Sequence, residues 1–474
     1  MPDYAIRNEC CVGYWKAGYN MRNMATEKAL EGKPYAGNPH VRFDEGEVAS
    51  VATPRRGSLF YRIGCVIVAA CAAVLETLAA GGSALPLIGD GVADDTAAIQ
   101  ARLDSGAACV YLPPPKDHYV ISRTLKIGSE QELRLDRFTR IRLAPQSNCP
   151  MLENRTYRAG TGTNVFVAVT GGIWDMDNRN QRGNFMQDPE LAKSAPKKFD
   201  PDFFFGMSMR FCHVERLTVR GVTVRNPVNY GIEFGHVSYV TADDITFDYR
   251  QGNPKLLNMD GLHFDGFCHH LRITNVRGTC YDDMIALNAN DGMCSPEEGP
   301  ISDVDIDGLY CDYCHSAVRL LSADAPISRV TIRNVHGNFY VSAVWLTHHF
   351  RDRPAPGRFD DIVISDVFAA KAIPPPDVDC PWRRSLPLIY VEGVANIGSL
   401  VMERIFRDER TLIAPTFGID RRETHVDSLV IRDCRMTNAL ETPIPFIEAK
   451  GKVKKMTVKD VDFAGRWTQT GRPE

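Results

Sequence analysis

The sequence predicts an all-β protein: a single-stranded right-handed parallel β-helix, a solenoid of stacked coils, with a short N-terminal capping helix. Three observations predict it. Short segments that alternate apolar and polar residues recur from about residue 213, as strands do. They recur at a period typical of solenoids. Each is followed by a second short strand whose apolar positions can be aligned from unit to unit. Because a solenoid core grows along one axis, 474 residues need not form several domains.

The first strand of each unit has a common pattern, in which apolar residues occupy every second position. Most steps between unit starts are between 26 and 33 residues. The period predicts one coil per unit, each stacked on the one before. The unit starts occupy residues 214–219, 271–276, 304–309, 330–335, 362–367, 429–434 and 456–461.

The second strand of each unit predicts one buried and one outward row. Successive strand residues point to opposite faces, so apolar positions mark the inside and the residues between them the outside. The buried row comprises Ile232, Leu262, Ile285, Val318 and Val344. The outward row comprises Glu233, His263, Ala286, Arg319 and Trp345. Coils stack about 4.8 Å apart, so we expect the outward row to line a polar cleft.

Residues 87–467 are predicted to form the β-helix, and residues 468–474 a C-terminal tail. Helical periodicity over residues 95–103, with Asp95 or Thr96 as the cap, predicts a helix that covers the open end of the solenoid. Residues 1–62 have no clear period and are interpreted as an irregular extension that need not belong to the functional protein. The apolar segment 63–86 is either signal-like, over residues 63–81, or a buried helix. The first alternative predicts a secreted or periplasmic protein.

Composition excludes several classes of partner and cofactor. There are 55 Lys and Arg against 59 Asp and Glu, without long basic runs, which argues against nucleic acid as a partner. The apolar run at 63–75 is too short for a stable membrane span.

The 14 cysteines are scattered, so most are interpreted as small buried residues. Residues 311–315 (Cys-Asp-Tyr-Cys-His) have the form of a haem attachment motif, but the repeat already accounts for them and no cofactor is expected.

Three carboxylates are predicted to converge next to the outward row. Asp260 and Asp283 precede equivalent positions of two successive second strands, and Asp282 lies beside the latter. Three packed acids repel one another when ionised, so one is expected to hold a proton near neutral pH. A protonated acid beside ionised carboxylates is the arrangement that glycosidases use as general acid and base. The alternative is that these side chains cap turns.

These segments resemble glycoside hydrolase family 28, the polygalacturonase family of the pectin-lyase-like β-helix superfamily. Residues 258–261 (Asn-Met-Asp-Gly) and 282–288 (Asp-Asp-Met-Ile-Ala-Leu-Asn) are similar to the family pattern Asn-Thr-Asp followed by Gly-Asp-Asp-Cys-Ile-Ala-Ile. Residues 89–100 look like the entry segment of many pectin-lyase-like proteins. The resemblance implies Asp282 as the general acid, Asp260 and Asp283 as the holders of the attacking water, hydrolysis with inversion, and no metal.

Several positions depart from the family pattern. The family histidine falls on Ser316, with His315 one place earlier, and its two basic residues that grip a uronate fall on Trp345 and Thr347. Arg319 could partly replace that charge, and Trp345 indicates a neutral or less charged sugar stacked on the ring. The candidate substrate-binding residues are Glu233, His263, Asn288, His315, Ser316, Arg319 and Trp345. No metal is assigned to His269 with His270 or to His348 with His349, because strand neighbours face opposite ways.

We therefore expect a glycosidase, a polygalacturonase-like hydrolase of a pectin-like or related glycan, with a carbohydrate as its partner. One alternative keeps the fold but eliminates across a uronate, as a Ca²⁺-dependent lyase with Arg319 as the base. A second alternative is a β-helix that binds glycans without cleaving them. Ca²⁺ dependence or an absence of released product would distinguish these from hydrolysis.

Overall fold

A computed structural model describes residues 85–158, 160–196, 199–292, 295–348, 354–376 and 381–468. The predicted extension at 1–62 and nearly all of the segment 63–86 lie outside these ranges, as do His349 and residues 469–474. The boundaries predicted there stay predictions. Within the part of the chain that the structure describes, no helix has the length and apolar character needed to cross a membrane.

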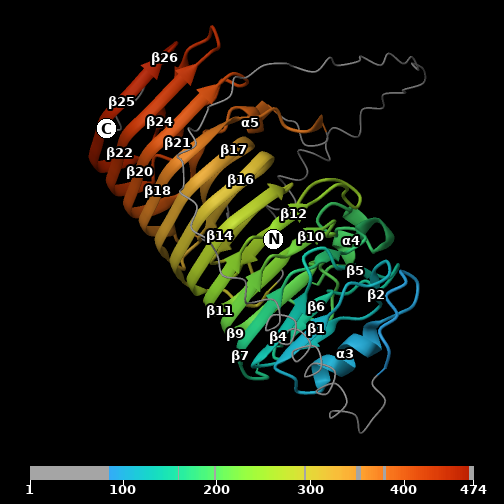
Figure 1. The fold of residues 1–474 in the computed structure, drawn as a ribbon. Coiled ribbons are helices and arrows are strands. Elements are labelled where there is room, and N and C mark those ends of the chain that lie inside the picture. The colour runs from blue at the N-terminus through green and yellow to red at the C-terminus, as the bar shows by residue number, and fades with distance from the viewer. Residues whose placement is uncertain are drawn as a thin grey trace, which may run out of the picture. The chain divides into compact units, whose positions relative to one another are not determined.

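The described residues form a stack of parallel strands, as predicted (Figure 1). Residues distant in sequence pair in register along the stack, so that β11 pairs with β9 on one side and with β13 and β14 on the other. The N-terminal part comprises α3 (Thr96–Asp104), β1 (Cys109–Leu112), β2 (Tyr119–Ile121), β3 (Leu125–Ile127), β4 (Gln131–Leu135), β5 (Arg140–Leu143), β6 (Leu152–Asn154), β7 (Asn164–Thr170), β8 (Ile173–Asp175), the 3₁₀ helix η2 (Asn178–Asn180) and α4 (Pro189–Ser194).

The middle and C-terminal coils continue the same stack. The middle part comprises β9 (Met209–Arg220), β10 (Thr223–Arg225), β11 (Ile232–Asp243), β12 (Thr246–Asp248), β13 (Leu262–Phe264), β14 (His269–Thr279), β15 (Asp283–Asn288), β16 (Ile301–Leu321) and β17 (Ile327–His348). The C-terminal part comprises β18 (Gly357–Lys371), α5 (Pro381–Arg384), β19 (Ile389–Gly393), β20 (Ala395–Glu409), β21 (Phe417–Ile419), β22 (His425–Asn438), β23 (Ile444–Pro445), β24 (Ile447–Ala449), β25 (Lys452–Ala464) and β26 (Trp467–Thr468). The last pair, β23 and β26, forms a separate small sheet.

The predicted registry of the second strands is confirmed. Ile232 pairs with Leu262, Leu262 with Ile285, Ile285 with Val318 and Val318 with Val344. All five side chains are fully buried. One continuous apolar core therefore runs along the inside of the coils, and it includes an aromatic stack in which the ring centroids of Phe211, Phe234 and Phe264 lie 6.0 and 4.4 Å apart.

Left-handed residues break the alternation of faces where the chain turns from one strand direction to the next. His213, His236 and His270 have φ angles of 55°, 49° and 55°. The prediction that His269 and His270 face opposite ways is therefore wrong, because their Nδ1 atoms lie 2.7 Å apart. The turn at His270 rotates its side chain back toward its neighbour.

The helix α3 lies at the N-terminal end of the stack, but its predicted cap is not made. Asp95 precedes the helix without a side-chain capping bond. Its carboxylate accepts hydrogen bonds from the backbone N–H groups of Ile88 and Gly89 at 2.6 and 3.1 Å. Asp94 accepts the N–H of Thr96 instead, at 2.9 Å. Hydrogen bonds to Asp94 and Asp95 therefore connect the entry segment to the start of the helix.

The described cysteines include buried free thiols and one disulfide. Cys212, Cys268, Cys280 and Cys434 are free and buried, as the composition predicted. The cysteines of the haem-like motif, Cys311 and Cys314, form a disulfide, which the sequence interpretation did not anticipate. The motif thus cross-links two positions within β16.

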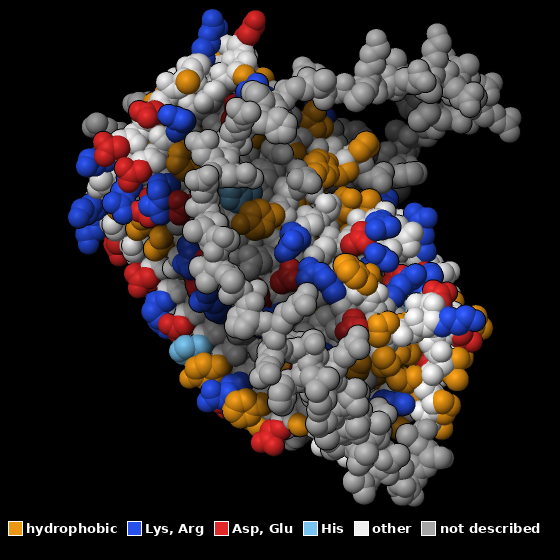
Figure 2. Space-filling view, viewed as in Figure 1, with side chains coloured by type: hydrophobic (Ala, Val, Ile, Leu, Met, Phe, Trp, Pro, Cys, Tyr) orange, Lys and Arg blue, Asp and Glu red, His pale blue; other side chains and the backbone are white. Residues whose placement is uncertain are grey.

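Ion pairs follow the outer corner of the coils. Figure 2 shows Lys and Arg intermingled with Asp and Glu along the edge where β14 to β22 turn in Figure 1. Such partly exposed pairs contribute little stability each, so the buried core carries the fold. The pairs include Arg277 with Asp244, Arg329 with Asp303, Arg404 with Asp366 and Arg432 with Glu403.

Candidate active site

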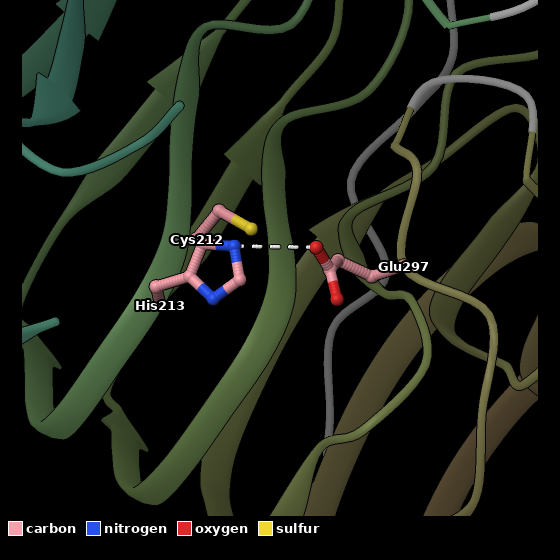
Figure 3. Close-up of side chains that lie close together, drawn as sticks. All are labelled: Cys212, His213 and Glu297. Atoms are coloured by element: carbon pink, nitrogen blue, oxygen red, sulfur yellow. Dashed lines mark ion pairs between the residues drawn. The ribbon is translucent and has the colours of Figure 1, made fainter. Parts of the chain in front are cut away.

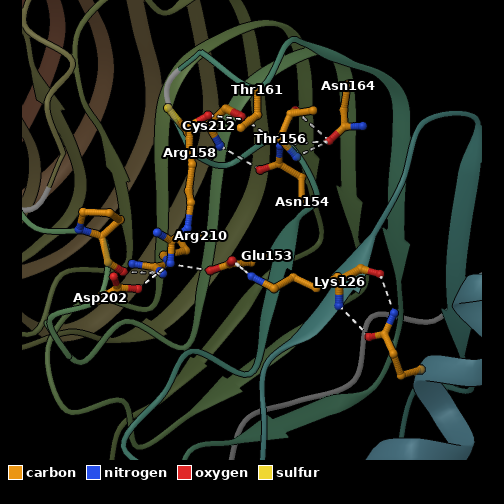
Figure 4. A network of polar contacts seen from close by, with 12 residues as sticks. Lys126, Glu153, Asn154, Thr156, Arg158, Thr161, Asn164, Asp202, Arg210 and Cys212 are labelled. Atoms are coloured by element: carbon orange, nitrogen blue, oxygen red, sulfur yellow. Dashed lines mark hydrogen bonds and ion pairs between the residues drawn. The ribbon is translucent and has the colours of Figure 1, made fainter.

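The predicted row exists and is longer than the sequence indicated, but its predicted members are buried rather than exposed on a cleft. Glu233, His263, Ala286, Arg319 and Trp345 are paired in succession from β11 to β17. The register extends the row upstream through Lys126, Glu153 and Arg210, and downstream to Tyr390. Figure 4 shows the upstream members joined by ion pairs, with Arg210 Nε 2.7 Å from a Glu153 oxygen. The row is thus charged at one end and aromatic at the other.

The three predicted acids lie together beside this row. Asp283 opens β15, and its backbone N–H donates a hydrogen bond of 3.1 Å to Asp260 Oδ1 on the coil before. Asn258 Nδ2 donates to Asp282 Oδ2 at 3.4 Å. Asp260 and Asp283 are buried, whereas the side chain of Asp282 keeps 14% of its surface exposed. Asp282 is therefore the acid best placed to meet a substrate.

Asp283 is held ionised by Arg319. Burial alone would raise the pKa of Asp283, but the Arg319 guanidinium lowers it below its usual value, with His315 and Ser316 adding to the effect. Arg319 Nε lies 2.9 Å from Asp283 Oδ2, an ion pair whose geometry falls short of a hydrogen bond. His315 Nδ1 lies 3.5 Å from the other oxygen. Opposite charge favours the carboxylate here.

Asp282 differs from its neighbour in the balance of burial and charge that sets its pKa. Burial raises the pKa of Asp282 to about 7, His315 opposes this rise, and the nearby carboxylates Asp260 and Asp283 add to it. His315 Nδ1 lies 3.4 Å from Asp282 Oδ1 and 3.0 Å from Ser316 Oγ. Two adjacent carboxyl groups thus differ in protonation near neutral pH, which is how acid and base roles are separated.

Asp260 belongs to a buried chain of polar groups. His263 Nδ1 donates to Asp260 Oδ2 at 2.6 Å, and His263 Nε2 lies 3.4 Å from Asp265 Oδ1. Burial raises the pKa of Asp260, but the hydrogen bond and charge of His263 oppose the rise. Burial would lower the pKa of His263, yet Asp265 and Asp260 raise it well above its usual value. A protonated His263 therefore orients Asp260 and favours its ionised form.

The other predicted site residues lie close by, together with Tyr230, which the sequence did not indicate. Tyr230 stacks on the His263 ring at 4.0 Å, and the Asn288 amide lies 3.3 Å from His263 Nε2. Glu233 is buried, and its pKa is raised well above its usual value by burial and by Asp265. Trp345 is also buried and stacks on Tyr390 at 6.2 Å. Glu233 and Trp345 therefore flank the acids from either end of the row.

Two acidic residues of the site were also not assigned from the sequence. Asp265 is fully buried and its pKa is raised to about 6, chiefly by burial. Asp291 Oδ2 lies 3.6 Å from His263 Nε2 and accepts a hydrogen bond from Asn288. Asp265 lies two residues after His263, beside the predicted row. Asp291 lies between β15 and β16, where the repeat pattern has no signal.

Ligand atoms of Asp282, Asp283 and His315 lie close enough to hold a metal ion. Zn²⁺ accepts such a set of carboxylates and an imidazole, whereas Ca²⁺ prefers oxygen ligands alone. Because Arg319 already balances the charge of Asp283, we assign no metal to these three residues.

No family model matches the chain, and no curated protein sequence matches it. Among solved structures, the chain is similar to PfbA, a surface adhesin of Streptococcus pneumoniae, with a TM-score of 0.53 and 13% identity over 80% of this chain and 91% of that chain. A Yersinia enterocolitica family 28 exopolygalacturonase matches at a TM-score of 0.48 and 15% identity, over 80% of this chain and 77% of that one. An Aspergillus tubingensis endo-xylogalacturonan hydrolase matches at 0.41 and 12%, over 81% and 95%. The adhesin match supports the β-helix fold alone.

Proposed function

We propose that this protein hydrolyses glycosidic bonds of a polysaccharide or oligosaccharide, with inversion, through Asp260, Asp282 and Asp283. The observation that carries the proposal is the unequal environment of two neighbouring carboxyl groups, of which only Asp283 lies 2.9 Å from the Arg319 Nε atom. The pKa of Asp282 is raised to about 7, mainly by burial, while that of Asp283 is lowered by Arg319. The resemblance of these residues to the family 28 pattern supports the same roles.

In the proposed reaction, Asp282 donates its proton to the glycosidic oxygen as the bond to the anomeric carbon breaks. A water molecule held between Asp260 and Asp283 attacks that carbon from the opposite face and gives its proton to one of these carboxylates. His263 positions Asp260 through their 2.6 Å hydrogen bond. Arg319 keeps Asp283 ionised, which suits the role of base.

The proposed substrate is a neutral or weakly charged glycan. A uronate carboxylate would need a cation to bind it, and the Arg319 guanidinium is already paired with Asp283 at 2.9 Å. The same pairing weakens the lyase alternative, which needs Arg319 as a base. Trp345 and Tyr390 continue the row as aromatic residues, and aromatic faces suit the apolar faces of sugar rings.

The test is a panel of glycans incubated with the wild-type protein and with Asp282→Asn. We expect the wild type to release a product of inverted configuration, detected by NMR, and the variant to lose turnover with an unchanged unfolding transition. Asp303→Asn, in an exposed pair with Arg329, is the matched control and should retain activity. Retained turnover in Asp282→Asn would remove the assignment of the acid.

A second candidate function is glycan binding without cleavage. The observation that favours it is the structural use of Asp260, which accepts the backbone N–H of Asp283 and is buried. Carboxylates in such positions also stabilise turns. A protein that binds a glycan of the panel and releases no product would establish this alternative.

A further inference from the structure

We propose that Cys212, His213 and Glu297 form a Zn²⁺ site that fastens the segment between β15 and β16 to β9. One thiol sulfur, one imidazole nitrogen and one carboxylate oxygen of these residues all lie within 4.8 Å of one another. Figure 3 shows the three side chains converging, with the Cys212 sulfur directed toward Glu297. The proposal does not depend on the proposed hydrolysis.

The local backbone explains why two neighbours in sequence face the same point. Cys212 and His213 are consecutive in β9, where alternation would place them on opposite faces. The left-handed φ of 55° at His213 turns the chain and brings its ring back toward the side of Cys212. The Asn154 side chain holds Cys212 by accepting its N–H at 2.9 Å and donating to its C=O at 2.8 Å (Figure 4). Both candidate ligands therefore start from a rigid strand.

Glu297 arrives from a different part of the chain. Its backbone C=O accepts the N–H of Gly266 at 2.8 Å, and its N–H donates to Ser295 Oγ at 3.1 Å. Its carboxylate lies 3.2 Å from His213 Nε2 and 3.3 Å from His236 Nδ1. The segment is thus folded back over the coil, with an acid whose side chain is 10% exposed.

A glycine keeps the space between the ligands open. Gly235 pairs with Cys212 on the adjacent coil. A Cβ atom at Gly235 would lie 2.9 Å from Ser295 Oγ, 3.2 Å from Glu297 Cγ and 3.3 Å from Cys212 Sγ. Its φ is not among the left-handed values of the chain, so the backbone does not require a glycine there. The missing side chain instead leaves a cradle bordered by the thiol and the carboxylate.

The donor set selects zinc among common divalent ions. One sulfur, one nitrogen and one oxygen, with a fourth position left for water or for His236, is a set that Zn²⁺ accepts in tetrahedral geometry. Ligand atoms about 2.1 Å from zinc stand roughly 3.4 Å apart in a tetrahedron. The His213 to Glu297 distance of 3.2 Å already fits this spacing. The thiolate and the carboxylate would balance the charge of the ion in a buried site.

Zinc there would stabilise the segment that also carries Asp291. This residue contacts His263 and Asn288, so the proposed ion lies outside the acid cluster but fixes part of its surroundings. The ordinary alternative is that the Glu297 carboxylate forms ion pairs with two histidines and that Cys212 is a buried thiol. A measurement of Zn²⁺ binding distinguishes the proposed zinc site from these ion pairs.

The test uses the full chain, freed of metal with a chelator and titrated with Zn²⁺ and with Co²⁺ as a spectroscopic probe. All variants carry His269→Ala and His270→Ala, because that exposed pair, with Nδ1 atoms 2.7 Å apart, could bind metal independently. We expect one Zn²⁺ per chain and a sulfur-to-cobalt charge-transfer band. Cys212→Ser and Glu297→Gln should each weaken Zn²⁺ binding at least about 100-fold, since loss even of outer-sphere partners costs ~10–100-fold.

The matched control is Cys434→Ser. Cys434 is also a free cysteine with 3% exposure, the same as Cys212, so the two substitutions remove equally buried thiols. The control should keep both the stoichiometry and the cobalt band, whereas Cys212→Ser should lose the band. A chain that binds no zinc, or a Cys212→Ser variant with the same affinity and band as the control, would overturn the proposal. Glu297→Gln keeps the shape of the side chain, so it decides the matter if Cys212→Ser fails to fold.

Discussion

The substitution Arg319→Met tests the reasoning about the buried acids most directly. It removes the guanidinium while keeping the length of the side chain. Asp283 and Arg319 are both buried, with exposed side-chain fractions of 0% and 7%. Removing one partner of a buried ion pair leaves an uncompensated charge and costs ~3–5 kcal/mol. We expect a loss of unfolding free energy of that size at pH 8.

The same substitution should change how stability depends on pH. In the wild type, Arg319 holds the pKa of Asp283 below its unfolded value, so the carboxylate stabilises the fold above about pH 4. In the variant, burial acts without the guanidinium and raises this pKa above the unfolded value. The folded state then binds the proton more tightly, and stability falls as pH rises from about 4 through the raised pKa. The deficit against wild type should therefore be smaller at pH 5 than at pH 8.

The assay is guanidinium chloride denaturation at pH 5 and pH 8, followed by far-ultraviolet circular dichroism. Arg277→Met is the control, because its pair with Asp244 is partly exposed and Arg137 also contacts that aspartate. Exposed pairs contribute ~0–1 kcal/mol. Equal losses in the two variants at pH 8, or a loss in Arg319→Met that does not shrink at pH 5, would refute the assignment of Arg319 as the partner that keeps Asp283 ionised.

Three further predictions concern catalysis and the core. The turnover rate should fall as pH rises above about 7. Burial raises the pKa of Asp282 to about 7, so the proton-donating form of this acid is lost at higher pH. A pH profile of kcat that is flat to alkaline pH would contradict this. His263→Phe keeps a ring to stack on Tyr230 but loses the hydrogen bond to Asp260. The kcat should therefore fall about tenfold or more, while the circular dichroism spectrum stays that of the wild type. An unchanged kcat would show that His263 does not position Asp260. Phe234→Ala empties the middle of the aromatic stack and should cost ~3–5 kcal/mol in denaturation, whereas Phe166→Ala, at an exposed ring, should cost far less.

The stacking of the coils was predictable because strand periodicity leaves little freedom. A shift of one residue would turn every inward side chain outward, so aligning apolar positions also aligned Glu233, His263, Ala286, Arg319 and Trp345, and the pairings confirm that register. The upstream end of the row was not predicted. Glu153 and Arg210 are paired neighbours but lie 57 residues apart, because η2, α4 and their connections are inserted between them and hide the period.

The sequence located the acids and the charged residues that most affect their pKa values, Arg319, His263 and His315, but not the carboxylates around them. The positions of Asp260 and Asp283 could be inferred from the alignment of successive second strands. Asp291 and Glu297 lie between β15 and β16, where no sequence period predicts where a side chain lies. The corners were misjudged for a related reason. Period-two alternation assumes extended backbone, and a left-handed residue such as His270 reverses the side on which the next group lies. Pattern reasoning is therefore reliable along strands and fails at turns.

The stacked geometry itself explains why one acid of the three differs from the others. A parallel coil places equivalent residues about 4.8 Å apart, so carboxylates on successive rungs repel one another unless each finds a positive partner. Arg319, one rung on, lies against Asp283, and His263, on the same rung, lies against Asp260. Asp282 has only the weaker contact with His315, at 3.4 Å. Burial therefore raises the pKa of Asp282 to about 7 and favours its protonated form. The spacing that builds the fold therefore also separates the pKa of Asp282, raised to about 7, from that of Asp283, which is lowered, and that difference is what the proposed hydrolysis requires.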